Sequence, residues 1–142
     1  MNNKLDSITN GLSASTEIVV GTRDTAHHVG SGKIKVLATP VMVTLMEEAA
    51  LMAVEGLLPE GYQSVGTNLN VSHIAATPVG CQVSAYAEVV SVDGHTIHFA
   101  VSASDNFGPI GHGTHERVVV NLERFDKRVQ EKVTGKDQPD RA

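Results

Sequence analysis

The feature of this sequence that most constrains its fold is one long segment of helix-forming residues. Four segments in which apolar and polar residues alternate follow it. Residues 41–57 (VMVTLMEEAALMAVEGL) consist mainly of Ala, Leu, Met and Glu, which are strong helix formers. Thr39 and Pro40 resemble an N-cap and a first helical residue, while Pro59 and Gly61 predict the end of the helix. The sequence therefore predicts one long helix in the first half of the chain.

After this helix, apolar residues recur at every second position, which is the period of a β-strand. The turn signals TPVG, DG and NFGP separate the segments, and Asp93-Gly94 between two alternating runs predicts a hairpin. A β-branched run at 16–20 predicts one earlier strand. The later predicted strands are residues 64–75, 81–92, 96–105 and 113–122. This order predicts an α+β fold in which an antiparallel sheet packs on one helix.

The length of 142 residues suits a single domain with one core. Hydrophobic residues make up 41% and charged residues 19%, a balance that is typical of globular rather than disordered chains. We expect a polar, loose N-terminal segment at 1–15, a folded domain at 16–128 and a polar C-terminal tail at 129–142. Apolar residues between 123 and 133 recur at helical spacing before a polar end, which we expect to be loose.

The charge distribution argues against nucleic-acid binding. The formal net charge is -5, and six of the eleven Lys and Arg residues lie after residue 122, so the remaining surface is acidic and repels phosphate. The first residues contain no apolar signal core, and the most apolar stretch, 36–58, contains three glutamates. We therefore expect a cytoplasmic protein that binds neither nucleic acid nor a membrane.

The sequence contains no convincing metal or cofactor motif. Cys81 is the only cysteine, which excludes an intramolecular disulfide and a CxxC metal site. His95 and His98 are three residues apart in a predicted strand, as are His112 and His115, so the members of each pair point to opposite faces. We expect no metal and no cofactor.

Glu47 is an anomaly in the predicted helix. The residues four before, three after and seven after it are Val43, Ala50 and Val54, which places Glu47 on the core-facing stripe. A carboxylate there is costly unless it is paired, hydrogen-bonded or protonated. Two interpretations remain open at this point. Either Glu47 is a chemically active carboxylate, or it lies at a wet edge of the sheet or pairs with a structural arginine.

Two further side chains are candidates for a site. His73 ends a predicted strand just before a Pro-Gly turn, where side chains often line a cleft, although a partly exposed structural role fits the spacing as well. Arg117 lies in a predicted strand on the same face as His115 and Val119. Its position fits a partner for a buried glutamate, a ligand for an anionic substrate or an ordinary surface residue.

Three segments together resemble the fluoroacetyl-CoA thioesterase group of the hotdog-fold superfamily. They are TPVMVTLMEEAA (39–50), SVGTNLNVSHIAATPVG (64–80) and IGHGTHERVVVNLERF (110–125), and the similarity is collinear over most of 16–128. The resemblance implies a hotdog fold, in which an antiparallel sheet wraps a long helix, and assembly as a homodimer. This sequence differs from the family at 30–38 (GSGKIKVLA), where the fluoroacetyl enzyme has a longer lid that contains aromatic residues.

The resemblance also implies a set of site residues. The family's catalytic threonine, glutamate and histidine fall on Thr39, Glu47 and His73, and its substrate-contacting glycine and arginine fall on Gly66 and Arg117. In such a site, the glutamate attacks a thioester or activates water, the threonine orients it, and the histidine polarises the carbonyl or protonates the leaving sulfur. The sites of this superfamily usually lie at the dimer interface, so these roles can be divided between subunits.

We therefore expect an acyl-CoA thioester hydrolase with a non-fluorinated acyl-CoA as its substrate. An alternative is a non-catalytic acyl-CoA-binding or sensing module, since a fold does not fix a function. A hydratase on the same fold is a poor fit, because it needs an Asp/His pair and residues 25–92 contain no Asp. Lys33, Lys35 and the basic cluster at 124–128 are candidates for binding the phosphates of coenzyme A, and a solvated polar tail explains the cluster equally well.

Overall fold

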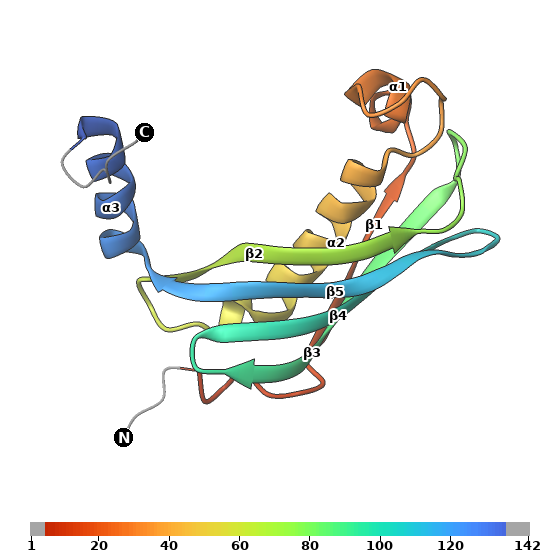
Figure 1. Cartoon of the computed structure of the whole chain (residues 1–142). Helices are drawn as coiled ribbons and strands as arrows, with labels where there is room; N and C mark the ends of the chain where they lie inside the picture. Colours follow the sequence, from red (N-terminus) through yellow and green to blue (C-terminus); the bar gives the residue numbers. More distant parts are fainter. Residues whose placement is uncertain (1–4, 136–142) are drawn as a thin grey trace.

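The computed structural model describes residues 5–135 and contains a five-stranded antiparallel sheet curved around a central helix (Figure 1). The chain therefore has the predicted α+β hotdog architecture. Two short helical elements, η1 (Thr22–Asp24) and α1 (Ala26–Val29), lie between the first strand and the central helix. A turn of 3-10 helix, η2 (Glu55–Leu57), follows the central helix. The main elements are β1 (Ser13–Val19), α2 (Thr39–Val54), β2 (Tyr62–His73), β3 (Gln82–Asp93), β4 (Thr96–Asp105), β5 (Gly108–Asn121) and α3 (Leu122–Thr134).

The strand order in the sheet is β1-β3-β4-β5-β2, so β1 and β2 are its two edges. Strands β3 and β4 form the hairpin expected at Asp93-Gly94, and Gly94 has the positive φ of 64° that such a turn requires. Strand β2 pairs only with β5 and carries a register shift between Gly66 and Asn68, which marks a β-bulge. The other edge of β2 is unpaired within the described chain.

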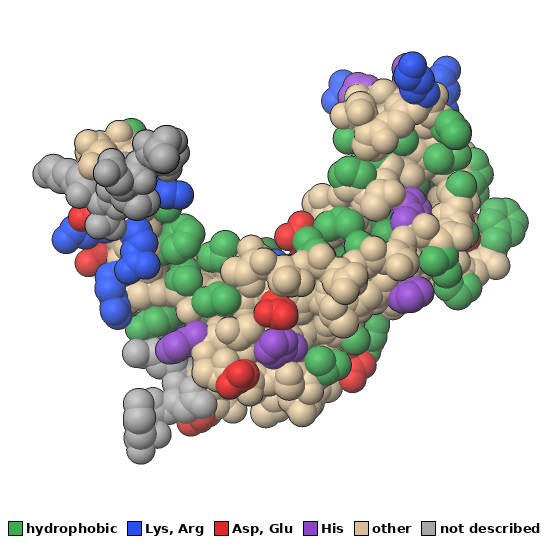
Figure 2. Space-filling view, in the orientation of Figure 1, with side chains coloured by type: hydrophobic (Ala, Val, Ile, Leu, Met, Phe, Trp, Pro, Cys, Tyr) green, Lys and Arg blue, Asp and Glu red, His purple; other side chains and the backbone are tan. Residues whose placement is uncertain are grey.

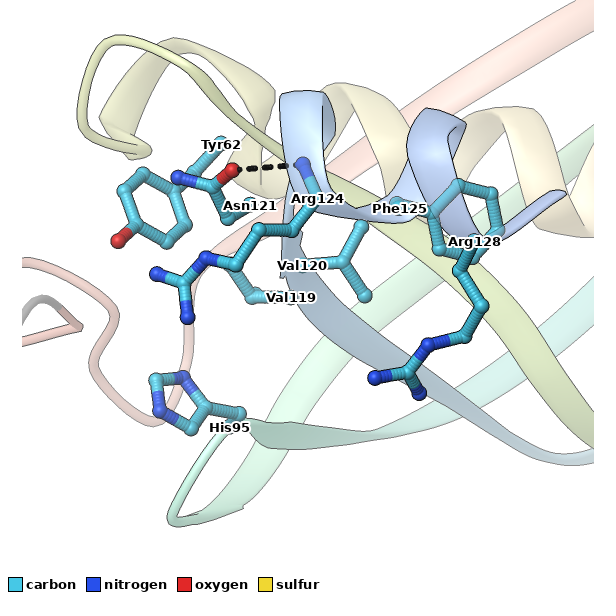
Figure 3. Close-up of a pocket in the computed structure, with 8 residues that line it drawn as sticks. All are labelled: Tyr62, His95, Val119, Val120, Asn121, Arg124, Phe125 and Arg128. Atoms are coloured by element: carbon cyan, nitrogen blue, oxygen red, sulfur yellow. Dashed lines mark hydrogen bonds between the residues drawn. The ribbon is translucent and has the colours of Figure 1, made fainter. Parts of the chain in front are cut away.

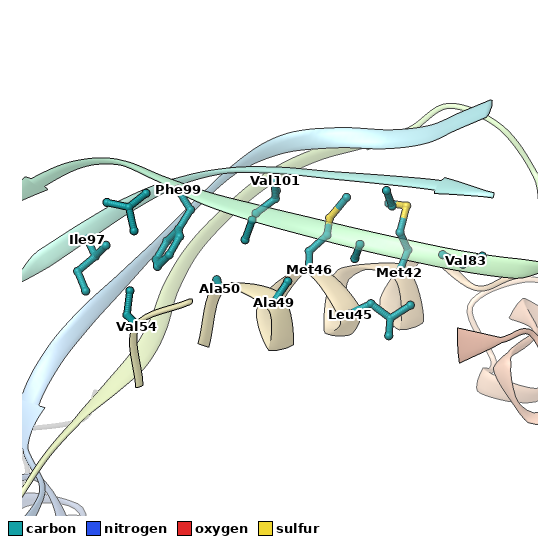
Figure 4. Packing of buried hydrophobic residues seen from close by; sticks show 14 of the residues in the cluster. Met42, Leu45, Met46, Ala49, Ala50, Val54, Val83, Ile97, Phe99 and Val101 are labelled. Atoms are coloured by element: carbon teal, nitrogen blue, oxygen red, sulfur yellow. The ribbon is translucent and has the colours of Figure 1, made fainter. Parts of the chain in front are cut away.

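The core lies between α2 and the concave face of the sheet. The side chains that α2 buries recur every three or four residues, as they do in a helix that packs on a layer. They face apolar side chains of the sheet, including Ile97, Phe99 and Val101 (Figure 4). The buried residues of α2 are Met42, Leu45, Met46, Ala49, Ala50 and Val54.

The structure differs from the prediction at the start of the chain. We expected residues 1–15 to be loose, but Leu5 and Ile8 are only 2% and 5% exposed and belong to the core. Strand β1 also begins at Ser13, ahead of the predicted residue 16. Two apolar residues in a polar stretch are enough to fix this segment, because the hydrophobic effect depends on buried area and not on periodicity.

Helix α2 begins one residue earlier than predicted, with Ala38 as its N-cap and Thr39 as its first residue. The expectation that Thr39 is the N-cap is therefore wrong, and the Thr39 hydroxyl bonds to another element instead. At the other end of the chain, the predicted helical spacing is confirmed by α3. This helix reaches Thr134, so the expected tail is helical at 129–134. The predicted loose end falls mostly at 136–142, outside the described residues.

Helices α1 and α3 rise from opposite ends of the sheet, and the surface between them is concave (Figures 1 and 2). Strand β2 runs along this concavity between the two ends. Within residues 5–135, no helix combines the length and apolar character needed to cross a membrane.

Candidate functional site

The first functional cluster joins the start of α2 to the end of β2. Thr39 Oγ1 lies 2.7 Å from Nδ1 of His73, which is a short side-chain hydrogen bond. Burial lowers the pKa of His73 from 6.5, and the backbone of Ala75 opposes this shift. The other ring nitrogen, Nε2, is buried and makes no well-formed hydrogen bond within residues 5–135. A neutral imidazole can donate from one ring nitrogen and accept at the other, which suits His73 to contact a substrate.

A cavity of about 400 Å³ opens beside this pair, a size typical of small-molecule sites. It is lined by Thr39, His73, residues 74–76 and side chains of the segment 31–37. Lys33 in that segment brings a cation to the same cavity. Thr39 and His73, which the sequence pointed to, therefore lie together at a site that can hold a ligand.

The second cluster forms around Gly66 in the middle of β2. A Cβ atom at this position would lie 3.0 Å from Oε2 of Glu47, 3.2 Å from Cε1 of His115 and 3.4 Å from Nη1 of Arg117. The backbone of Gly66 therefore approaches all three side chains more closely than a larger residue permits. The structure thus places Glu47, Gly66 and Arg117, three of the residues that the resemblance names, close together.

Arg117 is only 7% exposed and is held by three hydrogen bonds. Its Nε donates to Ser64 Oγ at 2.8 Å, its Nη2 donates to the Ser64 carbonyl at 3.1 Å, and its Nη1 lies 3.2 Å from Nε2 of His115. Burial lowers the pKa of Arg117 below its usual value, and the charge of Glu47 opposes that shift. The guanidinium is thus a fixed cation that faces the Glu47 carboxylate.

His115 and Ser64 are parts of this cluster that the sequence analysis did not assign. His115 is 1% exposed, stacks on Phe99 with ring centroids 5.9 Å apart, and places Nδ1 2.8 Å from the Asn68 carbonyl oxygen. Its place on one strand face with Arg117 was the only signal in the sequence. The bulge that directs the Asn68 carbonyl toward it leaves no recognisable pattern.

Glu47 differs from its predicted position. It is half-buried at the border of the apolar face of α2 and not within that face, and Val43 is half-buried beside it. Glu47 follows Thr39 by eight residues, which corresponds to a rise of about 12 Å along a helix. Within one chain, the Thr39–His73 pair and the cluster around Glu47 are therefore two separate half-sites along β2.

A different cavity of about 350 Å³ lies at the base of α3 (Figure 3). Arg124, whose backbone N–H donates to Asn121 Oδ1, extends its guanidinium toward His95, and Arg128 also lines the cavity. None of the five predicted site residues lines it. The candidate phosphate-binding cations are thus divided, because Lys33 lies beside Thr39 and His73 while Arg124 and Arg128 lie here. Within residues 5–135, no group of three His, Cys, Asp or Glu residues is placed to hold a metal ion.

Comparisons with known proteins agree with the fold of this chain. Residues 20–123 match the family described as fluoroacetyl-CoA-specific thioesterase. The fluoroacetyl-CoA thioesterase of Streptantibioticus cattleyicolor is 46% identical over 98 residues, which cover 69% of this chain and 70% of that protein. A solved structure of a fluoroacetyl-CoA thioesterase superposes with a TM-score of 0.82 at 36% identity, covering 94% of this chain and all of the other. A hot-dog-like protein from Thermanaerovibrio acidaminovorans has a TM-score of 0.83 at 28% identity, covering 90% and 95% of the two chains.

Proposed function

This chain belongs to the family of fluoroacetyl-CoA-specific thioesterases and is an acyl-CoA thioester hydrolase, and we propose that it acts through Thr39, Glu47 and His73 on a non-fluorinated acyl-CoA. The observation that carries the proposal is the Thr39–His73 hydrogen bond at the mouth of a ligand-sized cavity. The second half-site supports it, because there a carboxylate and a buried guanidinium meet at a glycine.

The roles follow from the hydrogen-bonding capacity of each group. When the Thr39 hydroxyl donates to Nδ1 of His73, the proton of the neutral ring lies on Nε2, a buried donor of a side chain that lines the cavity. This N–H polarises the thioester carbonyl. Glu47 supplies the attacking oxygen, either its own or that of a water molecule that it deprotonates. When water attacks, the new C–O bond replaces the C–S bond and gives the carboxylic acid directly. When the carboxylate attacks, it forms an acyl–Glu47 anhydride, which water then hydrolyses to the acid and free Glu47. In both routes a proton transfer to the sulfur releases coenzyme A as a thiol.

The two half-sites meet if two copies pair along the free edges of β2. In a symmetric antiparallel pairing, Gly66 of one subunit lies opposite His73 of the partner subunit when the two-fold axis passes between Leu69 and Asn70. The Glu47 of one subunit then faces the Thr39–His73 pair of the other. Residues 66–70 are all exposed in the single chain, including Leu69 at 37%, which supports their burial between subunits.

The acyl group is proposed from the segment between β1 and α2. Residues 30–38 contain no aromatic side chain, and Ile34, which lines the cavity, is 69% exposed. A flexible aliphatic side chain excludes water less completely than a packed aromatic lid, and it offers no edge that selects for fluorine. A general preference for acyl groups of matching size is therefore expected.

The first test is coenzyme A release from a panel of acetyl, fluoroacetyl, short branched, aromatic and long-chain acyl-CoAs. The wild type should hydrolyse at least one non-fluorinated member faster than fluoroacetyl-CoA, and Glu47→Gln should reduce turnover by about 100-fold or more. Glu48→Gln, on the exposed face of the same helix, is the matched control. Binding of acyl-CoA without hydrolysis of any member would contradict the proposal and favour a binding module.

The division of the site between subunits has its own test. Glu47→Gln and His73→Ala subunits, each inactive alone, are co-expressed with different tags and isolated as mixed dimers. In each isolated mixed dimer, one of the two sites combines an intact Glu47 with an intact His73, so activity should return to about half of the wild-type value when each site takes one residue from each subunit. No recovery of activity in the mixed dimers would show that each subunit carries a complete site.

A further inference from the structure

We infer that His115 is a positioning residue, which holds the Arg117 guanidinium toward Glu47 as a neutral imidazole with its proton on Nδ1. The inference rests on the proposed function in one respect, because the use of Arg117 in hydrolysis belongs to that proposal. The protonation pattern itself follows from the structure of the single chain.

The two neighbours of the His115 ring require the same tautomer. The Asn68 carbonyl oxygen, 2.8 Å from Nδ1, can only accept a hydrogen bond, so Nδ1 must carry a proton. Arg117 can only donate, so Nε2 of His115, 3.2 Å from Nη1, must present its lone pair. A neutral ring with Nδ1–H satisfies both contacts. The other neutral tautomer satisfies neither, and the protonated ring satisfies only one.

The bulge in β2 explains why a carbonyl oxygen is available at this position. Gly66 pairs with Arg117 and Asn68 pairs with Glu116, so Thr67 is the additional residue of the bulged strand. The Thr67 hydroxyl donates to the Glu116 carbonyl at 3.3 Å, while the Asn68 carbonyl meets the His115 ring. The edge strand thus fixes His115, and His115 in turn fixes one nitrogen of Arg117.

The charged groups around His115 keep the neutral form favourable. Burial is the main cause that lowers the pKa of His115 from 6.5, and the adjacent Arg117 cation lowers it further. The Asn68 carbonyl from β2, Glu47 from α2 and Glu116 from β5 act in the opposite direction. The ring of Phe99 from β4 covers one face of the imidazole and carries no charge.

The position of Arg117 depends on this acceptor. Ser64 binds Nε and Nη2, so it fixes one side of the guanidinium plane. Nη1 is the nitrogen nearest to the space above Gly66, and within residues 5–135 its hydrogen-bond partner is His115. Without that acceptor, the end of Arg117 that faces Glu47 loses its support, while the side anchored to Ser64 remains in place.

The tautomer is tested directly by nitrogen NMR of the histidine rings in the full-length protein at pH 7.5. His115 is assigned by the signal that disappears in His115→Gln. We expect a protonated Nδ1 and an unprotonated Nε2. A ring protonated on Nε2 only, or on both nitrogens, would overturn the inference. The NMR measurement does not depend on enzymatic activity. A protein that hydrolyses no acyl-CoA can therefore still have the expected His115 tautomer, so failure of this inference and failure of the proposed function give different results.

The positioning role is tested by a pair of variants in the hydrolysis assay. The amide oxygen of His115→Gln can accept from Arg117, whereas His115→Leu offers no acceptor. We expect kcat/KM to fall by about 10- to 100-fold in His115→Leu, as for loss of a hydrogen bond to a charged group. It should stay within about threefold of wild type in His115→Gln. His98→Leu, on the same sheet but paired with Glu116, is the control and should have little effect. Equal losses in both His115 variants, or no loss in either, would refute the role.

Discussion

Replacing Gly66 with alanine tests whether the close approach of β2 to Glu47 matters for the reaction. The new methyl group would lie 3.0 Å from Glu47 Oε2 and 3.2 Å from His115 Cε1. A contact of 3.0 Å is tighter than most real Cβ contacts, so the carboxylate must move by a few tenths of an ångström. His115 cannot yield as easily, because Asn68 and Phe99 fix its ring. Glu47 is half-buried at the end of a flexible side chain, and it therefore takes most of the displacement.

The expected consequence is a larger loss of activity than of stability. Overpacking costs about 1–3 kcal/mol, and the low end applies where a side chain can move, which corresponds to a Tm lower by about 3–4 °C. A displaced catalytic group can cost up to about 100-fold, so we expect kcat/KM for the best acyl-CoA to fall by roughly 10- to 100-fold. Thermal unfolding followed by circular dichroism and coenzyme A release measure the two effects on the same preparation.

Two other glycines serve as controls for this substitution. Gly56 has no atom within 4 Å of an added Cβ, so Gly56→Ala should keep full activity and an unchanged or slightly higher Tm. At Gly113 the added Cβ would meet the backbone of β2, with Val71 Cα at 2.6 Å, so Gly113→Ala should lower Tm by more than about 10 °C. The reasoning is refuted if Gly66→Ala keeps wild-type kcat/KM, or if it destabilises the fold as strongly as Gly113→Ala.

Two further predictions concern stability. Burial lowers the pKa values of His73 and His115 below 6.5, so the unfolded chain binds more protons in that range and the free energy of unfolding should decrease as pH falls through 6.5. Urea unfolding at pH 7.5 and 5.5 should show this decrease in the free energy of unfolding. The decrease should be smaller in the His73→Gln/His115→Gln double variant. An equal pH dependence in both proteins would contradict the assignment of the effect to these two histidines. Thr77 is fully buried and donates to Asp105 Oδ2 at 2.7 Å, so Thr77→Val should cost about 1–2 kcal/mol in urea unfolding at pH 7. This bond lowers the pKa of Asp105 from 3.8, so the deficit should shrink as pH falls through that pKa, and a deficit that grows in acid would contradict the account.

The regular elements were predictable because their signals are local and repeated. Alternation identified four of the strands, and helix-forming residues between turn signals identified α2. Strand β5 begins at Gly108, five residues before the predicted start at 113, because the segment NFGP (106–109), which is typical of a turn, also supplies the first two residues of the strand. Strand β2 ends opposite Gly111, so β5 has no β2 partner at Pro109, where a missing N–H is tolerated.

The site was predictable only in part, because its contacts join residues far apart in the sequence. The periodicity of the helix singled out Glu47, and the end of a predicted strand made His73 a candidate. The resemblance added Thr39 and assigned a role to each residue. His115 gave a weaker signal, since a histidine in a strand more often lies at the surface or packs structurally. Its role depends on the Asn68 carbonyl, which faces inward only because the strand bulges at that point. Backbone direction at a bulge cannot be inferred from polar residues that fit either a turn or a strand.

The methionines of α2 can report on local opening of the structure through their rates of oxidation. Met42 and Met46 are completely buried on the apolar face of this helix, whereas Met52 on the same helix is 52% exposed. A thioether reacts with peroxide only when it is accessible to solvent. Met52 is therefore oxidised in the native state, whereas Met42 and Met46 are oxidised only when the structure around them opens. Met42 lies within one turn of Thr39, and Met46 lies one turn further along the helix. The oxidation rates of the three methionines, measured by mass spectrometry with and without added acyl-CoA, therefore compare the opening of the helix end that carries Thr39 with the opening of its centre.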